Sequence, residues 1–283
     1  STLDTGIINV ALSFLRGQFQ TTTNIASFTI TGYTLALAIS ILPLGVLSDK
    51  FGKLKISYLG FVLFGLSSLF CGFANSIGWL ITGQEMGAAA LQATSAALIT
   101  TLVSEDRKNS AISILGVMIG LGPVLGPSLG GILLSLNLWR FIFWINVPFA
   151  LIGIICNHYL LAKVSEQTSE WTLDSLGTVL NASMLVCLLL GLSLLSKSHL
   201  LGISLILIII SFLIGIWFYR LECSKESALV NVKGLSENSR VLSYLFQTVA
   251  FGFASAMIFL LPPFIFEQLY HLGVGQTGFL VLG

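Results

Sequence analysis

The chain has 283 residues, of which 55% are hydrophobic and 9% are charged, whereas a soluble domain carries about 25% charged residues. Together with a mean hydropathy of +0.95, this composition excludes a soluble globular protein and predicts an all-α polytopic membrane protein. The net charge of +1 gives no basis for binding nucleic acid, and the four cysteines lack the spacing of a metal site.

Membrane-spanning helices need about 20 mostly apolar residues, and this length divides the chain into a series of predicted spans. They cover residues 1–15, 24–48, 56–74, 79–103, 110–136, 139–162, 175–195, 200–219 and 241–266, and a further one begins near residue 277. Because the chain begins and ends inside apolar runs, we expect it to be a piece of a longer protein. Pro262 and Pro263 are expected to break the ninth span near its outer end.

The distribution of Lys and Arg predicts which connections face the cytoplasm. Most of the 13 such residues lie in alternate connections, at residues 49–55, 104–109, 163–174 and 220–240. The other connections hold only Arg16, Arg140 and Lys197. We therefore place the first set in the cytoplasm. The tryptophans, including Trp139 and Trp144, lie near span ends, as expected of an interfacial belt.

The first span carries a carboxylate, Asp4, with Asn9 on a nearby face. A charged side chain at the centre of a bilayer costs about 2.5–3.5 kcal/mol, so such a group tends to serve a function. A desolvated carboxylate can also take up a proton near neutral pH. The alternative is a carboxylate paired inside the bundle or placed near the interface.

The connection after the second span reads Gly-Val-Leu-Ser-Asp-Lys-Phe-Gly-Lys-Leu-Lys from Gly45 onwards. Gly45 and Gly52 allow a tight reversal, and Asp49 can cap the next helix. The connection is either a charged turn that obeys the positive-inside rule or a conformational latch. We call Gly45, Asp49, Gly52 and Lys53 the cytoplasmic latch.

The fourth span contains a second intramembrane acid, Glu85, directly after Gln84. Three interpretations stay open: a protonatable group that assists Asp4, a structural hydrogen bond to Gln92, or a damaged gene. Tyr33, Gln84 and Gln92 are the candidate polar groups of an otherwise apolar substrate cavity.

The fifth span is unusually rich in glycine and proline. Glycines four positions apart let another helix approach backbone to backbone, either for simple close packing or for movement. Each proline removes a helix hydrogen bond, so we expect a bent or loosened helix. We call the set the glycine–proline helix: Gly116, Gly120, Gly122, Pro123, Gly126, Pro127, Gly130 and Gly131.

Several of these strings resemble signatures of the major facilitator superfamily, and together they resemble its fourteen-helix drug:proton antiporters. Gly-Pro-Ser-Leu-Gly-Gly from Gly126 is similar to the antiporter motif on the fifth helix of such exporters. The connection from Gly45 resembles the signature loop of the superfamily, with Leu54 in place of a basic residue.

Residues 3–12 resemble the first-helix motif of the same antiporters, in which the aspartate is implicated in proton coupling. Residues 84–89 resemble the fourth-helix motif, but Ile81 replaces its arginine and Glu85 its first glycine. Two further markers are the phrase at residues 139–148 and the Asp-x-x-Gly at residues 174–177, which begins the first of two inserted helices in that group.

The resemblance implies a major facilitator fold and a division of the chain into three parts. Residues 1–163 form the N-terminal six-helix bundle with a truncated first helix. Residues 164–220 form two inserted linker helices. Residues 221–283 form a cytoplasmic loop and the start of the C-terminal bundle.

The resemblance further implies proton-coupled efflux of small amphipathic or cationic compounds by alternating access, in the bacterial inner membrane. Asp4 would carry the proton with help from Glu85, and no enzymatic activity, cofactor or metal is expected. The partners would be the transported compound, protons and the lipid bilayer, with a periplasmic adaptor left open. The alternatives are a metabolite symporter or exporter of the same superfamily, or a non-functional truncated membrane protein.

Overall fold

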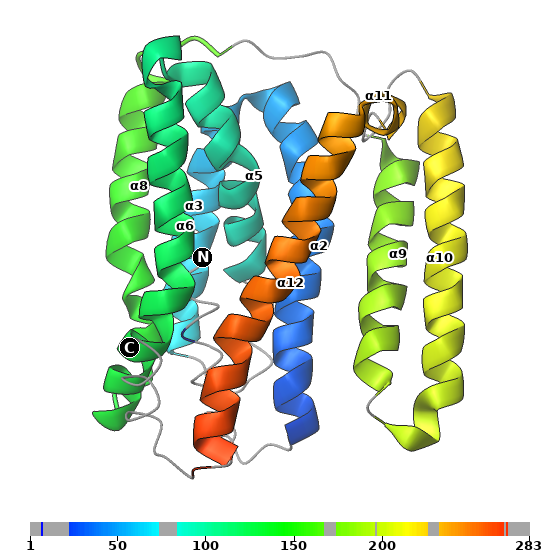
Figure 1. The fold of residues 1–283 in the computed structure, drawn as a ribbon. Helices are drawn as coiled ribbons and strands as arrows, with labels where there is room; N and C mark the ends of the chain where they lie inside the picture. The colour runs from blue at the N-terminus through cyan, green and yellow to red at the C-terminus, as the bar shows by residue number, and fades with distance from the viewer. Residues whose placement is uncertain are drawn as a thin grey trace.

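The computed structural model describes residues 7, 23–73, 84–166, 174–195, 197–225, 232–268 and 270, and every structural statement below concerns this part of the chain. It is entirely helical, and its long helices stand side by side (Figure 1). Six of them are long and apolar enough to cross a membrane. This confirms the predicted all-α membrane bundle.

The helices follow the predicted spans closely. In chain order they are α2 (Thr23–Phe51), α3 (Lys53–Gly72), α5 (Gln84–Leu102), α6 (Glu105–Ser135), α7 (Phe141–Trp144), α8 (Asn146–Leu161), α9 (Ser175–Leu194), the 3₁₀ turn η1 (Ser198–Leu200), α10 (Leu201–Ser224), α11 (Val232–Glu237) and α12 (Ser239–Gln268).

Three predicted connections are shorter than expected. The loop at residues 49–55 reduces to Gly52, and the loop at residues 104–109 is mostly the first turn of α6. Glu105 and Asp106 stabilise that turn because negative charge is favourable at a helix N-terminus. The polar stretch at residues 220–240 contains the end of α10 and the short helix α11. Polar residues at a span end therefore extend the helix instead of ending it.

The expected break at Pro262 and Pro263 is wrong, because α12 continues through both prolines to Gln268. The helix α6 likewise runs without interruption past Pro123 and Pro127. A helix in a membrane bundle tolerates proline because neighbouring groups can satisfy the freed backbone carbonyls.

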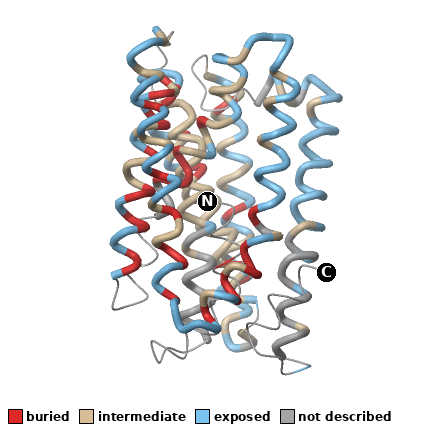
Figure 2. Tube along the Cα trace, turned by 90° about the vertical axis from the view of Figure 1, so that its left-hand side faces the viewer, coloured by how far each residue is buried: buried red, intermediate tan, exposed pale blue. Residues whose placement is uncertain are grey.

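Close backbone contacts make α3 the central helix. A Cβ atom at Gly87 of α5 would lie 2.5 Å from the backbone nitrogen of Phe64 in α3, and one at Gly60 would lie 2.9 Å from the Ala90 Cβ. On the other side, a Cβ at Gly65 would lie 2.9 Å from Ala150 of α8. Half of the α3 span is buried, against 11% of the α10 span. Buried residues accordingly gather in one part of the bundle (Figure 2).

The connection between α6 and α8 is also partly buried. Trp139 is 4% exposed, and the Arg140 guanidinium lies 4.5 Å from the centre of its ring. Trp144 donates its indole N–H to the Leu69 carbonyl, at 3.4 Å, and contacts Gly72 of α3. Trp139 therefore lies in the connection between two spans with its ring buried, and its place in an interfacial belt stays a prediction.

The helices α9 and α10 form a hairpin that stands beside α2 (Figure 1). Two buried serines of α10 hold it together. Ser204 donates to the Gly191 carbonyl at 2.7 Å, and Ser211 donates to the Met184 carbonyl at 2.9 Å. Such bonds are favourable in a membrane, where a hydroxyl group has no water to bind.

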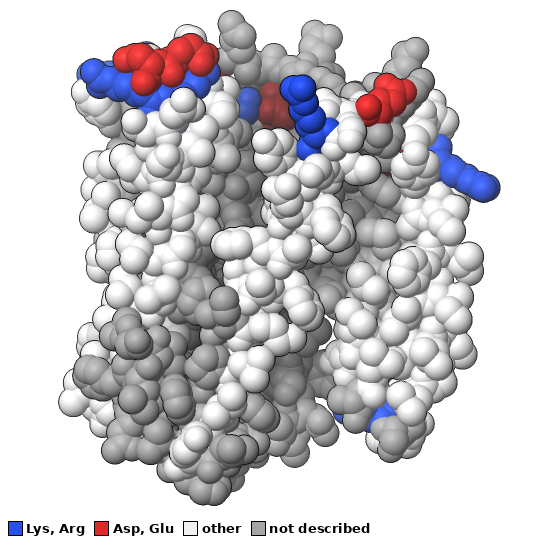
Figure 3. All heavy atoms as spheres, viewed as in Figure 1, with Lys and Arg blue, Asp and Glu red and all other residues white. Residues whose placement is uncertain are grey.

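Charged side chains gather mainly at one end of the helices, the upper end in Figure 3, and leave the flanks largely uncharged. This end includes the start of α6, the end of α8 and the end of α10 (Figure 1). It carries the described lysines and arginines of the connections that the sequence assigns to the cytoplasm. The fold therefore places those alternate connections at one end.

Substituting Gly87 with leucine is expected to destabilise the bundle, because the new side chain would meet the α3 backbone, which cannot move aside. Overpacking costs typically about 1–3 kcal/mol. The midpoint of thermal unfolding of the purified protein in detergent should fall. Gly202→Leu is the matched control, since a Cβ there meets no atom within 4 Å. Equal midpoints for the two variants would contradict the α3–α5 contact.

Candidate functional site

The structure places the predicted polar residues of the cavity on two helices. Tyr33 belongs to α2, and Gln84 and Glu85 begin α5, but the side chains of all three lie outside the described residues. Gln92 is exposed on α5. Asp4 lies outside the described residues. The helices that carry Tyr33 and Gln92, α2 and α5, pack against each other.

The glycine–proline helix, α6, has two different halves. Gly116 and Gly120 are exposed, and a Cβ at either position would meet no atom within 4 Å. The second half is buried at Gly122, Gly126, Pro127, Gly130 and Gly131. Among the residues that the structure describes, the expected close approach is seen in the second half, at Gly130.

The close approach occurs between Gly130 and Ile7. A Cβ at Gly130 would lie 3.2 Å from the Ile7 Cγ2 atom and 3.4 Å from both the Cα and the carbonyl oxygen of Ile7. Ile7 is fully buried and lies three positions after Asp4 in the sequence. Ile7, the one described residue of the first-span motif, thus packs against the glycine–proline helix.

The cytoplasmic latch has a different geometry from the one predicted. Gly52 alone separates α2 from α3, and its φ of 105° is a conformation that favours glycine. Gly45 lies inside α2, so the reversal does not use it. Asp49 also lies inside α2, where its carboxylate pairs with Lys53 at 3.1 Å. The prediction that Asp49 caps the next helix is wrong.

The side chain that caps α3 is Glu166, in the connection after α8. Its Oε1 atom accepts a hydrogen bond of 2.7 Å from the backbone N–H of Leu54. Its Oε2 atom is buried without a hydrogen-bond partner among the described residues and lies where a Cβ of Gly52 would be. Gly52 is therefore needed twice, for its backbone conformation and for the space that Glu166 occupies.

Sequence reasoning missed Glu166 because it lies 112 positions from Leu54. The only signal in the sequence is an acidic residue in a connection otherwise assigned to the cytoplasm by its lysine. Next to Glu166 is a half-polar hollow of about 430 Å³, lined by Lys53, Thr101, Leu102, Val164, Ser165 and Glu166. Among the described residues, no group of three or more His, Cys, Asp or Glu side chains could hold a metal ion.

Replacing Glu166 with alanine is expected to destabilise the protein by about 0.5–2 kcal/mol, the usual cost of losing a helix cap. Glu166→Gln should lose less, because its amide oxygen still accepts the Leu54 N–H bond. Thermal unfolding of the purified protein measures both. Ser165→Ala, at an exposed neighbouring position, is the control. A Glu166→Ala variant as stable as this control would exclude the cap.

The helix α9 begins directly after Asp174, as the sequence predicts. The Asp174 carboxylate accepts a bond of 3.0 Å from the Gly177 N–H and pairs with Lys225 at 2.6 Å. Burial acts to raise the pKa of Asp174, but the Gly177 bond, the Lys225 ammonium group and a hydrogen bond with Glu222 together lower it below its ordinary value. The ion pair joins the start of α9 to the end of α10.

The stability of this junction should depend on pH. Because folding lowers the pKa of Asp174, its carboxylate stabilises the protein above pH about 4, and this contribution is lost as the pH falls through the lowered value. Asp174→Asn keeps a capping acceptor but loses the charge, so it should cost about 1–3 kcal/mol at pH 7.

The test is thermal unfolding of wild type and Asp174→Asn as a function of pH. The difference between them should shrink below pH 4. Asp106→Asn is the control, because the Asp106 side chain is 74% exposed and its loss removes only the weak effect of an exposed charge at a helix N-terminus, so the difference from wild type should be clearly smaller than for Asp174→Asn. A constant difference across the range would mean that the charge of Asp174 does not stabilise the fold.

A bundle of long apolar helices, with its charged connections gathered mainly at one end and tight glycine contacts inside, defines a multi-pass membrane protein. Residues 1–175 match the sequence profile of the Major Facilitator Superfamily, and the chain belongs to this family. The superfamily assignment made from the motifs is therefore confirmed.

Known relatives are similar over different parts of the chain. The riboflavin transporter RibZ of Clostridioides difficile (strain 630) is 28% identical over 285 residues, 99% of this chain and 61% of that protein. The uncharacterized transporter YebQ of Escherichia coli (strain K12) is 27% identical over 283 residues, 99% of this chain and 62% of that protein.

The multidrug resistance protein Stp of Mycobacterium tuberculosis (strain CDC 1551 / Oshkosh) is 34% identical over 172 residues, 59% of this chain and 32% of that protein. The chain thus spans about three fifths of the length of the relatives that it matches from end to end.

Proposed function

We propose that the protein exports small amphipathic or cationic compounds in exchange for protons, by alternating access, as a fourteen-helix drug:proton antiporter of the bacterial inner membrane. The family and the relative named as a multidrug resistance protein support this proposal. The observation that carries it is the contact between Ile7 and Gly130, which joins the two motifs expected to couple protons and to switch conformation.

In this proposal the glycine–proline helix is the moving wall of the transporter. Its buried half, from Gly122 to Gly131, packs inside the N-terminal bundle against the first span. Its open half offers Gly116 and Gly120 as a surface without side chains, which suits close approach by a helix of the second bundle. Movement then occurs in the half of α6 that carries Gly116 and Gly120, while the half from Gly122 to Gly131 stays fixed.

The proton would be taken up and released by Asp4, with Glu85 assisting from the start of α5. The compound would bind between the two bundles, where major facilitator proteins hold their substrates near the membrane midplane. Tyr33, Gln84 and Gln92 are the polar contacts that we propose for it. The packing of α2 against α5 supports a shared cavity for these residues.

The cytoplasmic latch would close the inner face in one state. The Asp49–Lys53 ion pair has side chains 53% and 21% exposed, so by itself it contributes little. The stronger element is Glu166, whose bond to Leu54 ties the start of α3 to the connection after α8. We propose that the latch acts through the hydrogen bond between Glu166 and Leu54 and through the positive φ of Gly52.

The arrangement of the chain that goes with this function has an N-terminal bundle at residues 1–163, two linker helices at residues 164–220 and the start of a second bundle at residues 221–283. The hydrogen bonds within the α9–α10 hairpin support the linker pair as a unit. The helix α10 extends to Ser224, four residues past that boundary.

The test is proton-driven efflux of a fluorescent cation, such as ethidium, by the full-length protein in everted membrane vesicles. Asp4→Asn should reduce efflux to the level of vesicles without transporter, because the carboxylate could no longer exchange a proton. Glu105→Gln, a neutral substitution at the charged end of α6, is the control and should leave efflux intact. Wild-type efflux by Asp4→Asn would remove this residue from the coupling role.

A second candidate is transport of a metabolite, which the riboflavin transporter among the relatives favours. The same protein would then move riboflavin instead of ethidium. Measurements with riboflavin in intact cells separate the candidates, since an importer raises the cellular content and a drug exporter does not.

A further inference from the structure

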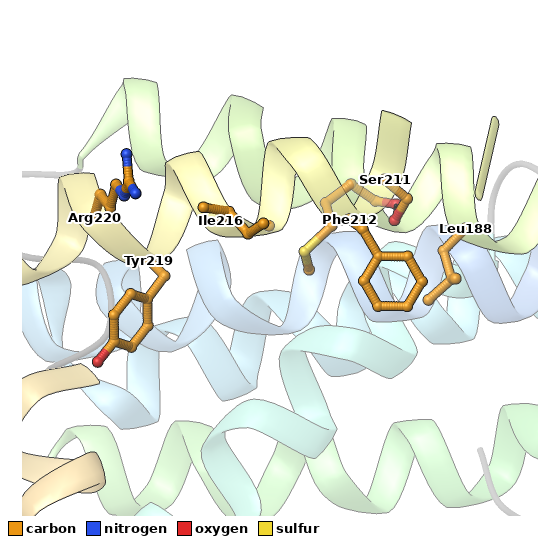
Figure 4. A pocket seen from close by; sticks show the side chains of 8 residues that line it. Leu188, Ser211, Phe212, Ile216, Tyr219 and Arg220 are labelled. Carbon is orange, nitrogen blue, oxygen red and sulfur yellow. Dashed lines mark hydrogen bonds between the residues drawn. The ribbon is translucent and has the colours of Figure 1, made fainter. Parts of the chain in front are cut away.

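The α9–α10 hairpin contains a groove, lined by residues of both helices, that the proposed transport cycle does not use. Its volume is about 370 Å³, and its lining includes Met184, Leu188, Phe212, Gly215, Tyr219 and Arg220. The labelled side chains of α10 follow the helix, with Tyr219 and Arg220 toward one end, where they project to opposite sides, and Phe212 toward the other end near Leu188 of α9 (Figure 4). The groove therefore runs along the helix axis.

The floor of the groove is apolar. Gly215 has no side chain there, and a Cβ at this position would lie 3.2 Å from the Met184 sulfur. The hydroxyl group of Ser211 donates to the Met184 carbonyl, so it offers no free donor to an occupant. Phe212 and Tyr219 lie two turns apart on one face of α10, about 10 Å along the axis. This floor suits a hydrocarbon chain.

The end of the groove is cationic. Arg220 is exposed and forms no ion pair with any residue that the structure describes. Lys225, five residues further on, forms an ion pair with Asp174. This end of α10 is the one where charged groups gather in Figure 3, which the sequence assigns to the cytoplasmic side. An exposed Tyr219 beside Arg220 is typical of the depth of lipid headgroups.

We propose that this groove binds an anionic phospholipid of the cytoplasmic leaflet. An acyl chain lies along Gly215 between Phe212 and Tyr219, and the phosphate group contacts Arg220. The charge of the guanidinium group selects anionic over zwitterionic headgroups, as basic sites on the cytoplasmic side of membrane proteins do. The inserted hairpin is then a lipid-anchored element at the side of the transporter.

The test is native mass spectrometry of the purified full-length protein, titrated with phosphatidylglycerol or phosphatidylcholine of equal chain length. The wild type should retain phosphatidylglycerol several-fold better. Arg220→Gln should make retention of the two lipids equal. Gly215→Leu fills the groove and should lower retention of both lipids. Arg107→Gln is the control, because that arginine is highly exposed at the same end of the bundle and should keep the wild-type preference.

Glycerol phosphate, which has the headgroup charge without acyl chains, should not bind at the same concentration; binding equal to that of the lipid would mean a simple anion site and would overturn the proposal. An unchanged lipid preference in Arg220→Gln would overturn it too. A photocrosslinker at Phe212 should label lipid. Crosslinking to another part of the protein would mean that a helix occupies the groove in place of a lipid, and it would overturn the proposal.

Discussion

The contact on which the rest of the bundle depends is the approach of α5 to the backbone of α3 at Gly60 and Gly87. Side chains are absent at both positions, so the two helices come close enough for dispersion contacts between their main chains. In lipid this packing takes the place of the hydrophobic effect, since the surrounding acyl chains are as apolar as the core. The central position of α3 follows, with α8 packed on its other side at Gly65.

The ends of α3 connect this packing to the candidate machinery. At its start, Gly52 and Glu166 join the cytoplasmic latch to the connection after α8, a link between distant parts of the N-terminal bundle. The first span meets α6 separately, at Gly130. The same residue type, glycine, therefore serves packing at one place, a sharp reversal at another and an open face at Gly116 and Gly120.

The α9–α10 hairpin follows a different principle. Polar groups buried between two apolar helices, including Ser204 and Ser211, hold it together, and the Asp174–Lys225 pair closes one end. Its outside is almost entirely apolar, with 11% of the α10 span buried. A unit that satisfies its own polar groups and leaves an apolar surface is suited to lie at the lipid boundary, where the groove beside Gly215 opens.

The sequence alone determined the class and the spans, because span length and charge placement are local properties that the bilayer constrains directly. It indicated the family through the resemblance of its motifs. Tertiary structure decided what depends on residues far apart in the chain. The cap of α3 comes from Glu166 and not from Asp49, and Trp139 is 4% exposed although it lies in a connection between two spans. Pro262 does not break α12, since a helix in lipid gains more from continuing than from exposing its backbone.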